Sequence, residues 1–563
     1  MPAACAMQAA PTMRPVRDVD DEIAFLLGED QKASLMGGAY EAADRYDRQL
    51  ATWTPPIQGP DADILPDKSL ADARALDIMR NDAFAAAGST LHKDNIVGAM
   101  FMLNAKPNTA VLGLDEVWAE EFQQEVEAKF TTWGESFNHW ADAAGRNTFT
   151  AMIRLAVGVY VVSGEVLATS EWLRPTRRPF RTAIQMVELN RLCDPQDQIF
   201  DLERVRGGVE IDSRGAPIAY YIRRASPGHL LFSQDSYRWS RIRARNSFGR
   251  PQVFHIFEQQ RPGQTRGISQ LVAALKEMRT TKRFRDITLQ NAVVNASFAA
   301  AIESELPSQA VFESVGGGNV GEAITSYATD YLGAVAKYAG NSRNMHIDGV
   351  KIPHFFPGTK LSLHPMGTPG GVGTEFEAGL LRYIAANLDV SYEELSRDYS
   401  QTNYSSARAG MLGTWKAAQS RKKMVADRFA ALIYRNWFEE AVNAGEIEAL
   451  KGRSIPNIYD SLAMEAYTRC DWIGAARGMI DELKETQASI LRIKQGLTTY
   501  EDELGRQGKD WRATFRQMKR EQDLMDELGI APEEANAINA ASGDVREASN
   551  GEADEPRGTD DDD

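Results

Sequence analysis

The glycine-rich run at 316–321, Gly-Gly-Gly-Asn-Val-Gly, is the pattern in the sequence that comes closest to a cofactor site. It fits GxGxxG, in which the glycines permit a tight turn and let a dinucleotide pyrophosphate meet the N–H groups of a helix. However, the preceding apolar segment is short, no βαβ repeat surrounds the run, and Asp330 and Asp348 are badly spaced for a ribose contact. The pattern therefore favours a loop over a nucleotide-dependent oxidoreductase.

No other pattern of a catalytic or metal centre stands out in the sequence. GxxxxGK(S/T), HExxH and GxSxG are missing, so the chemistries that these motifs carry are not predicted. His346, His354 and His364 follow one another at spacings of eight and ten residues, a weak match to metal ligation. A nucleic-acid-processing enzyme, the other enzymatic alternative, would need a compact carboxylate cluster that the sequence does not indicate. We therefore expect no enzyme, no cofactor and no metal site.

Arginines and aromatic residues alternate in the stretch 237–250, which has two interpretations. Basic side chains neutralise phosphates and aromatic rings stack on bases, so the stretch suits a nucleic-acid surface. It also suits a salt-bridge surface between subunits or domains, and the sequence favours this second reading. The basic members are Arg238, Arg241, Arg243, Arg245 and Arg250, next to Tyr237, Trp239 and Phe248.

A polar segment at 391–404 lies between two predicted helices. It is either a loop in solvent or a loop that projects into a functional space, and the pattern alone favours the solvent loop. Its polar members are Arg397, Asp398, Gln401, Thr402 and Asn403.

Helices and strands are expected to alternate in blocks along the chain. Ser69 is a predicted N-cap for a helix through 71–87, after a cluster of prolines and glycine at 55–66. From about 149 to 257, β-branched and aromatic residues predict strands. The expected strands include VGVYVV (157–162), GVEI (208–211) and PIAYYI (217–222). Apolar residues at every fourth position predict the core-facing stripe of a further helix: Trp118, Phe122, Val126 and Phe130.

Long helices dominate the second half. A helix beginning near Arg266 meets no Pro or Gly from 269 to 306, and residues 268–305 would span about 60 Å if unbroken. Loops with short strands at 307–373 separate it from a helix at 375–387. A further helix at 405–444 and a mainly helical region up to 529 follow. The fold class is therefore α+β.

Composition and charge set outer limits. The chain has 563 residues, 43% hydrophobic and 25% charged, as is typical of globular proteins. Its net charge of −16 is unevenly spread: residues 544–563 hold nine acids against two arginines, whereas 174–285 hold 22 basic against 10 acidic residues. The longest apolar run is too short for a membrane helix, and Cys5, Cys193 and Cys470 lie too far apart for a disulfide framework. We expect no membrane partner.

Seven segments of the sequence resemble the lambda-type portal proteins of tailed bacteriophages. They occur in the same order as in that family, and the resemblance runs from about residue 70 to 520. The segments are RNDAFAAAGSTLHKDNIVGAMFMLNAKPN (80–108), WADAAGRNTF (140–149), SGEVLA (163–168), GGVEIDSRGAPIAYYIR (207–223), HIFEQQRPGQTRGIS (255–269), NYSSARAG (403–410) and WIGAARGMIDELKE (472–485).

The resemblance implies a function in the virion. Portals of this type are rings, usually dodecamers, at one capsid vertex, through which double-stranded DNA is packaged and ejected. The expected partners are further copies of the chain, the terminase large subunit, the major capsid and scaffold proteins and the head-tail adaptor. The protein would be made in the host cytoplasm and would not itself be an enzyme.

The resemblance also implies a portal-protein fold with long stem helices, a β-rich wing and a helical C-terminal crown. The expected regions are an N-terminal arm (1–69), the wing (70–265, helical then β-rich), stem helix 1 (266–305), the clip (306–373), stem helix 2 (374–389), the channel loop (390–404), a wing helix (405–445), the crown (446–529) and an acidic disordered tail (530–563).

Two groups of residues become candidates for the DNA channel under this resemblance. The first is the polar segment, with Arg397, Asp398, Gln401, Thr402 and Asn403. The second lies on the first stem helix and comprises Lys282, Arg283 and Arg285, which would either face the bore or form salt bridges to the neighbouring subunit.

Overall fold

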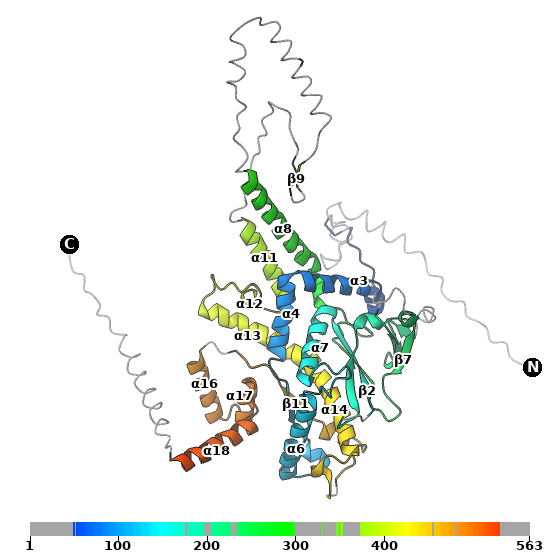
Figure 1. Cartoon of the computed structure of the whole chain (residues 1–563), viewed down its shortest axis with the longest axis vertical. Helices are drawn as coiled ribbons and strands as arrows, with labels where there is room; N and C mark the ends of the chain where they lie inside the picture. The colour runs from blue at the N-terminus through cyan, green and yellow to red at the C-terminus, as the bar shows by residue number, and fades with distance from the viewer. Residues whose placement is uncertain are drawn as a thin grey trace, which may run out of the picture. The chain divides into compact units, whose positions relative to one another are not determined.

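The structure is a computed structural model of the whole chain (Figure 1), and it describes residues 49–50, 52–174, 178–195, 204–226, 234–298, 329, 345–347, 350–352, 372–452, 455–478 and 481–529. The chain divides into two units, Met1–Asp63 and Ile64–Asp563. Among the described residues, no helix is long and apolar enough to cross a membrane. The glycine-rich run at 316–321 and the acidic tail lie outside the described residues.

The first two long helices differ from the single helix predicted after Ser69. Helix α3 spans Pro60–Asn81, so Ser69 lies inside it, and α4 spans Ala83–Ile96. The carboxylate of Asp82 accepts a hydrogen bond from the N–H of Ala85 at 2.9 Å and caps α4. The prediction was wrong because Pro60 fits the first position of a helix and α3 continues through Pro66, whereas Asp82 is a strong N-cap that starts a new helix.

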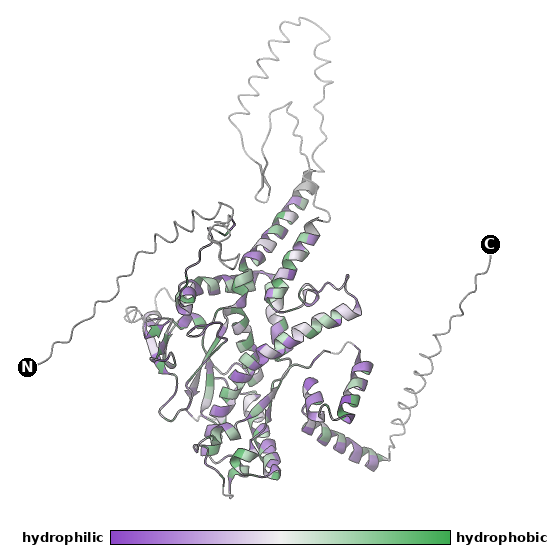
Figure 2. Ribbon diagram, turned by 180° about the vertical axis from the view of Figure 1, so that it is seen from behind, coloured by the Kyte–Doolittle hydropathy of each residue, from purple (hydrophilic) through white to green (hydrophobic). Residues whose placement is uncertain are grey.

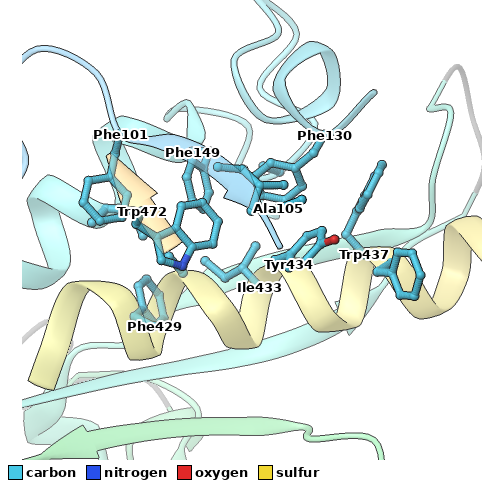
Figure 3. Close-up of a cluster of buried hydrophobic side chains, with 14 of the residues drawn as sticks. Phe101, Ala105, Phe130, Phe149, Phe429, Ile433, Tyr434, Trp437 and Trp472 are labelled. Carbon is cyan, nitrogen blue, oxygen red and sulfur yellow. The ribbon is translucent and has the colours of Figure 1, made fainter. Parts of the chain in front are cut away.

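The largest core cluster joins elements that are distant in sequence. Its aromatic centre is drawn in Figure 3. The ring centroids of Phe130 and Trp437 lie 5.3 Å apart. All four residues of the predicted stripe at 118–130 are at most 2% exposed, which confirms that prediction. The cluster is built mainly from α6 (Glu116–Gly134), α7 (Phe149–Ser163), α14 (Asp427–Asn443), β1 (Met102–Ala105) and β11 (Cys470–Ile473).

Helix α7 contains VGVYVV, which was wrongly predicted to be a strand. Thr148 caps its start by accepting a hydrogen bond from the N–H of Ala151, and Gly164 ends it in the left-handed conformation. The helix is buried on most of its surface, so apart from Thr150, Arg154 and Ser163 its residues are apolar and the run 155–162 shows no helical period. A short apolar run of this kind cannot be assigned to helix or strand from periodicity alone.

Two antiparallel sheets follow α7, and they include the predicted strands GVEI and PIAYYI. The first has the order β3-β2-β8 and the second β4-β5-β6-β7. A separate apolar cluster, including Leu167, Tyr220 and Val253, holds residues of both sheets. The strands are β2 (Glu165–Trp172), β3 (Thr182–Met186), β4 (Val205–Arg206), β5 (Val209–Ile211), β6 (Pro217–Arg223), β7 (Trp239–Arg243) and β8 (Val253–Phe257).

Helices α8 (Leu275–Phe298) and α11 (Val372–Asn387) lie side by side in Figure 1. The regular helix begins later than the predicted residue 266, because Ser269 caps a 3₁₀ turn at Gln270–Ala274. A third apolar cluster joins the base of both helices to α4. Between them, β9 (Met345–Ile347) pairs with β10 (Val350–Ile352).

The helix predicted at 405–444 is present in two parts. Helix α13 (Tyr404–Arg421) leads through a π-helical turn at Lys422–Ala426 into α14. The short helix α12 (Tyr392–Ser396) precedes it. Because the π turn lies inside a continuous helix, the predicted extent is confirmed.

The chain beyond α14 contains one segment that packs into the main core and one that does not. The first segment includes α15 (Ala463–Tyr467) and the strand β11, which pairs with β1. The second contains α16 (Glu482–Lys494), α17 (Tyr500–Arg506) and α18 (Trp511–Leu528). Figure 2 shows this second group mostly in hydrophilic colours, and α16 and α18 contain no buried residue.

Candidate functional site

The polar loop, residues 397–403, connects α12 to α13 and is largely exposed. Arg397 takes the left-handed conformation at the end of α12, and its N–H donates to the carbonyl of Glu393 at 2.8 Å. Asp398 accepts a hydrogen bond from the N–H of Ser400 at 3.0 Å, and hydrogen bonding from Ser400 holds the pKa of Asp398 below its usual value. The exposed part of the loop is thus folded on itself by local bonds.

Asn403 has a structural role that the sequence analysis did not assign. Its side-chain oxygen accepts a hydrogen bond from the N–H of Ser406 at 2.8 Å, and the Ser406 hydroxyl accepts one from the N–H of Asn403 at 3.2 Å. This reciprocal arrangement is a capping box at the start of α13. The Asn403 amide is therefore used to hold the end of the loop.

The other end of the loop stands on a fixed base. Leu395 in α12 is 1% exposed and belongs to the apolar cluster beneath α8 and α11. The hydroxyl of Thr414 donates to the carboxylate of Glu394 at 2.6 Å and accepts from the N–H of Ser391 at 3.0 Å, so α12 is bound to α13. The chain therefore presents an exposed polar loop from two anchored helix ends.

The three candidates on α8 differ in their surroundings. Lys282 donates from Nζ to the carbonyl of Asn81 at 2.8 Å. Arg285 forms an ion pair with Glu377 on α11 and lies over the ring of Phe84, 4.3 Å from its centroid.

Arg283 is exposed, and within the described part of the chain it forms no hydrogen bond or ion pair. Lys282 and Arg285 therefore have partners in their own chain. The described residues also contain no hydrogen bond or ion pair that joins these three to the polar loop.

The Arg-rich stretch at 237–250 forms contacts within the chain. Arg241 makes two hydrogen bonds to Glu210, at 2.7 and 2.9 Å. Arg250 lies 3.4 Å from the carboxylate of Glu439 and 5.2 Å from the ring centroid of Trp172. Arg241 and Arg250 therefore have partners within their own chain, and a salt-bridge surface between subunits or domains stays a prediction.

A buried ionic group at the start of the segment leading to α8 was not singled out from the sequence. This junction cluster comprises Lys68, Glu165, His255 and Arg266. Glu165 is fully buried. Its carboxylate oxygens lie 2.6 Å from a guanidinium nitrogen of Arg266, 3.1 Å from Nζ of Lys68 and 2.9 Å from Nε2 of His255. A charged residue at the head of the apolar strand Glu165–Trp172 was the available signal, because such a charge requires partners when buried.

The partners of Glu165 determine its charge. Burial alone would raise the pKa of its carboxyl, but Arg266, Lys68 and the hydrogen bond from His255 hold that pKa well below the usual value. Burial lowers the pKa of His255 despite its contact with Glu165. Glu165 is therefore a carboxylate at neutral pH.

The described residues contain no group of three or more His, Cys, Asp and Glu side chains that could hold a metal ion. The glycine-rich run falls outside those residues, so its interpretation as a loop remains a prediction.

The sequence comparisons with known proteins agree on one family. A family model for the lambda family of phage portal proteins matches residues 46–422. The portal protein of Escherichia phage N15 is 36% identical over 515 residues, covering 91% of this chain and 95% of that protein. Portal protein B of Escherichia phage lambda is 35% identical over 518 residues, with 91% and 94% covered. A chain from the neck of an empty gene transfer agent particle is 12% identical, with a TM-score of 0.35, over 83% of this chain and 98% of that one.

Proposed function

The chain belongs to the lambda family of phage portal proteins, and from this premise we propose that it forms a dodecameric ring at one capsid vertex through which double-stranded DNA is packaged and ejected. As a portal protein it is a structural component of the virion and not an enzyme. The two enzymatic alternatives, a nucleic-acid-processing enzyme and an oxidoreductase, are therefore set aside. Identical subunits that meet head to tail form a closed ring when the rotation from one subunit to the next is a whole fraction of a full turn.

The proposed partners follow from the absence of a motor in the chain. Its sequence has no P-loop motif, so a separate terminase large subunit would dock on the ring and supply ATP hydrolysis. The major capsid and scaffold proteins would surround the ring during assembly. The head-tail adaptor would then replace the terminase.

The proposed regions of the ring use the helices and sheets described above. Helices α8 and α11 would form the stem, and residues 306–373 the clip beyond it. The sheets with α14 would form the wing, and α16–α18 would belong to the crown. Packing between Phe284 and Phe376, with ring centroids 5.6 Å apart, supports a stem in which α8 and α11 act as one rod.

The observation that carries the channel assignment is the exposed polar loop on its anchored base. We place this loop against the DNA, with Gln401 and Thr402 among its contacts. Each phosphate that a Lys or Arg neutralises adds a salt-dependent hold on DNA. Of residues 397–403, only Arg397 is basic, and Asp398 follows it, so the loop would touch DNA without trapping it.

Shortening the loop tests this function. Replacing residues 398–402 with two glycines retains Asn403, which caps α13, and removes the reach of the loop. We expect rings of normal mass but heads that package or retain less DNA. The measurement is the DNA content of heads assembled with the variant.

A second variant controls for side-chain chemistry. It keeps the length of residues 398–402 but consists of Gly and Ser, so it separates the reach of the loop from its polar contacts. Normal filling of heads with the shortened loop would rule out the assignment of residues 397–403 to the channel.

A further inference from the structure

A basic pocket lies between α13, the segment after β11, and helices α16 and α17. It is a hollow of about 290 Å³ that opens to solvent. Five of its lining side chains are cationic and two are acidic: Arg408, Arg477, Lys484, Arg492, Arg506, Glu485 and Glu503. Two of the segments by which the chain resembles the portal family, 403–410 and 472–485, supply Arg408 and Arg477.

The acidic residues of the basic pocket do not neutralise all of its cations. Glu503 accepts hydrogen bonds from Arg492 at 3.1 Å, Arg506 at 3.0 Å and Ser489 at 2.9 Å. Burial would raise the pKa of Glu503, but the bonds from Ser489 and Arg492 hold it below the usual value. Glu503 is thus a carboxylate that is paired with Arg492 and Arg506 and does not neutralise the other cations of the pocket.

Lys484 pairs with Asp481 at 3.0 Å, so Arg408 and Arg477 are the pocket cations that have no hydrogen-bonded carboxylate partner among the described residues. Arg408 has Glu485 as its nearest carboxylate partner in the described structure, at 3.8 Å, beyond hydrogen-bond distance. Arg477 is half-buried, and in the residues described its guanidinium has no hydrogen bond or ion pair. Both side chains also line a second, smaller hollow of about 40 Å³.

The backbone fixes the position of Arg477. Its N–H donates to the carbonyl of Arg506 at 2.8 Å, which joins the segment after β11 to the end of α17. Arg408 is held by helix α13. The two guanidinium groups are therefore presented from anchored backbone, which reduces the entropy lost when they bind an anion.

We propose that the basic pocket binds a phosphate of the DNA backbone, with Arg408 and Arg477 as its ligands. The planar guanidinium group matches a phosphate through two parallel hydrogen bonds, and such contacts do not depend on base sequence. Arg408 lies on α13 five residues after Asn403, about 8 Å along the helix, so DNA at the polar loop would pass close to it. The identity of the anion rests on the proposed function.

The test measures DNA binding by the full-length protein. The variant R408Q/R477Q is compared with R146Q/R214Q, which removes the same charge from two exposed arginines in loops outside the pocket. Binding of a short fluorescent DNA duplex is followed by anisotropy over a series of salt concentrations. We expect the pocket variant to bind roughly tenfold more weakly at low salt, with a salt slope shallower by about two, because two phosphate contacts are lost.

Two further variants test whether the geometry of the guanidinium group matters and whether the fold is retained. R408K/R477K keeps the charge but loses the planar fork, and we expect intermediate affinity. The single variant R477Q removes a side chain that bonds to no described residue, so its fold should be retained, and its salt slope should fall by about one. A native ring mass and an unchanged unfolding midpoint confirm integrity.

Two results would overturn the proposal. One is DNA binding by R408Q/R477Q equal to that of the parent. The other is an equal loss of affinity in R408Q/R477Q and in the control variant, which would mean that net charge and not the pocket determines DNA binding. Either result leaves the channel function standing, because head filling with the shortened polar loop tests that function separately.

Discussion

Arg266 joins three parts of the chain to the start of the segment that leads to α8. Its guanidinium contacts Glu165 and donates to the carbonyls of Leu192 at 2.8 Å and Gly207 at 2.6 Å. These bonds connect both sheets to the base of α8. The N–H of Gly267 also donates to Glu165 at 2.9 Å, so the segment before α8 is held to the first sheet by backbone as well as by Arg266.

Replacing Arg266 with Met should lower the free energy of unfolding by about 3 kcal/mol, because Glu165 would lose its strongest partner while still buried. Lys68, 3.1 Å from Glu165, keeps the loss at the lower end of the range for broken buried pairs. Urea unfolding measures the change, and Arg214→Met, at an exposed turn, is the matched control. Equal midpoints for the two variants would contradict a stabilising role for Arg266.

His92 makes stability depend on pH. Burial, together with the nearby charge of Arg421, lowers the pKa of His92 to about 3. The unfolded chain therefore takes up a proton as pH falls below about 6.5, whereas the folded chain does not, and stability declines by up to about 1.4 kcal/mol per pH unit. His255, whose pKa is also lowered, acts in the same direction.

We expect His92→Gln to lose less stability than the parent between pH 6.5 and 5. Glu165 does not contribute in this window. Its folded pKa is depressed, so its stabilisation persists above the usual carboxyl pKa and is lost only at lower pH. Unfolding midpoints at several pH values check this, and parallel curves for the two proteins would refute the role of His92.

At the scale of elements, the junction between α7 and the segment before α8 depends on one glycine. Gly164 has a φ of 75°, and a Cβ there would lie 2.1 Å from the carbonyl carbon of Ile268. Gly215 has a φ of 85°, but a Cβ there would meet no atom within 4 Å. Substituting Gly215 therefore tests backbone strain alone, whereas substituting Gly164 tests strain together with a steric clash.

Gly215→Ala should cost about 1 kcal/mol, and Gly164→Ala clearly more, since the second change adds a clash with backbone to the strain of a positive φ. Thermal unfolding of both variants provides the comparison. Equal losses would show that the segment at Ile268 yields to the added methyl group.

The sequence predicted some elements well and others poorly, for identifiable reasons. The stripe from Trp118 to Phe130 was recognisable because one face is buried and the other is not. Helix α7 was missed because burial on most of its surface removes that contrast. In the candidate site, the polar loop was found from its composition. The partners of Lys282 and Arg285 were not, since Asn81 and Glu377 are distant in sequence.

At the scale of the whole molecule, ring formation predicts a mass. A dodecamer of 62.3 kDa subunits would have a mass of about 748 kDa. Native mass measurement of the purified protein, with images of the same sample, should reveal particles near that mass with a central hole. A ring with one subunit more or fewer would correct the stoichiometry but still support ring formation. A monomer even in the presence of scaffold protein would contradict self-assembly of the chain into a ring.

The π-helical turn between α13 and α14 has a consequence for how this helix tolerates length changes. A π turn accommodates one more residue than an α turn, so deleting one residue from Lys422–Ala426 would restore a regular helix. The phase of α14 would then stay nearly the same, and Phe429, Ile433 and Trp437 would still face the core, whereas deleting a residue from the regular part of α13 would rotate them by about 100°. The turn therefore lets an inserted residue persist while α13 and α14 each keep their own buried face.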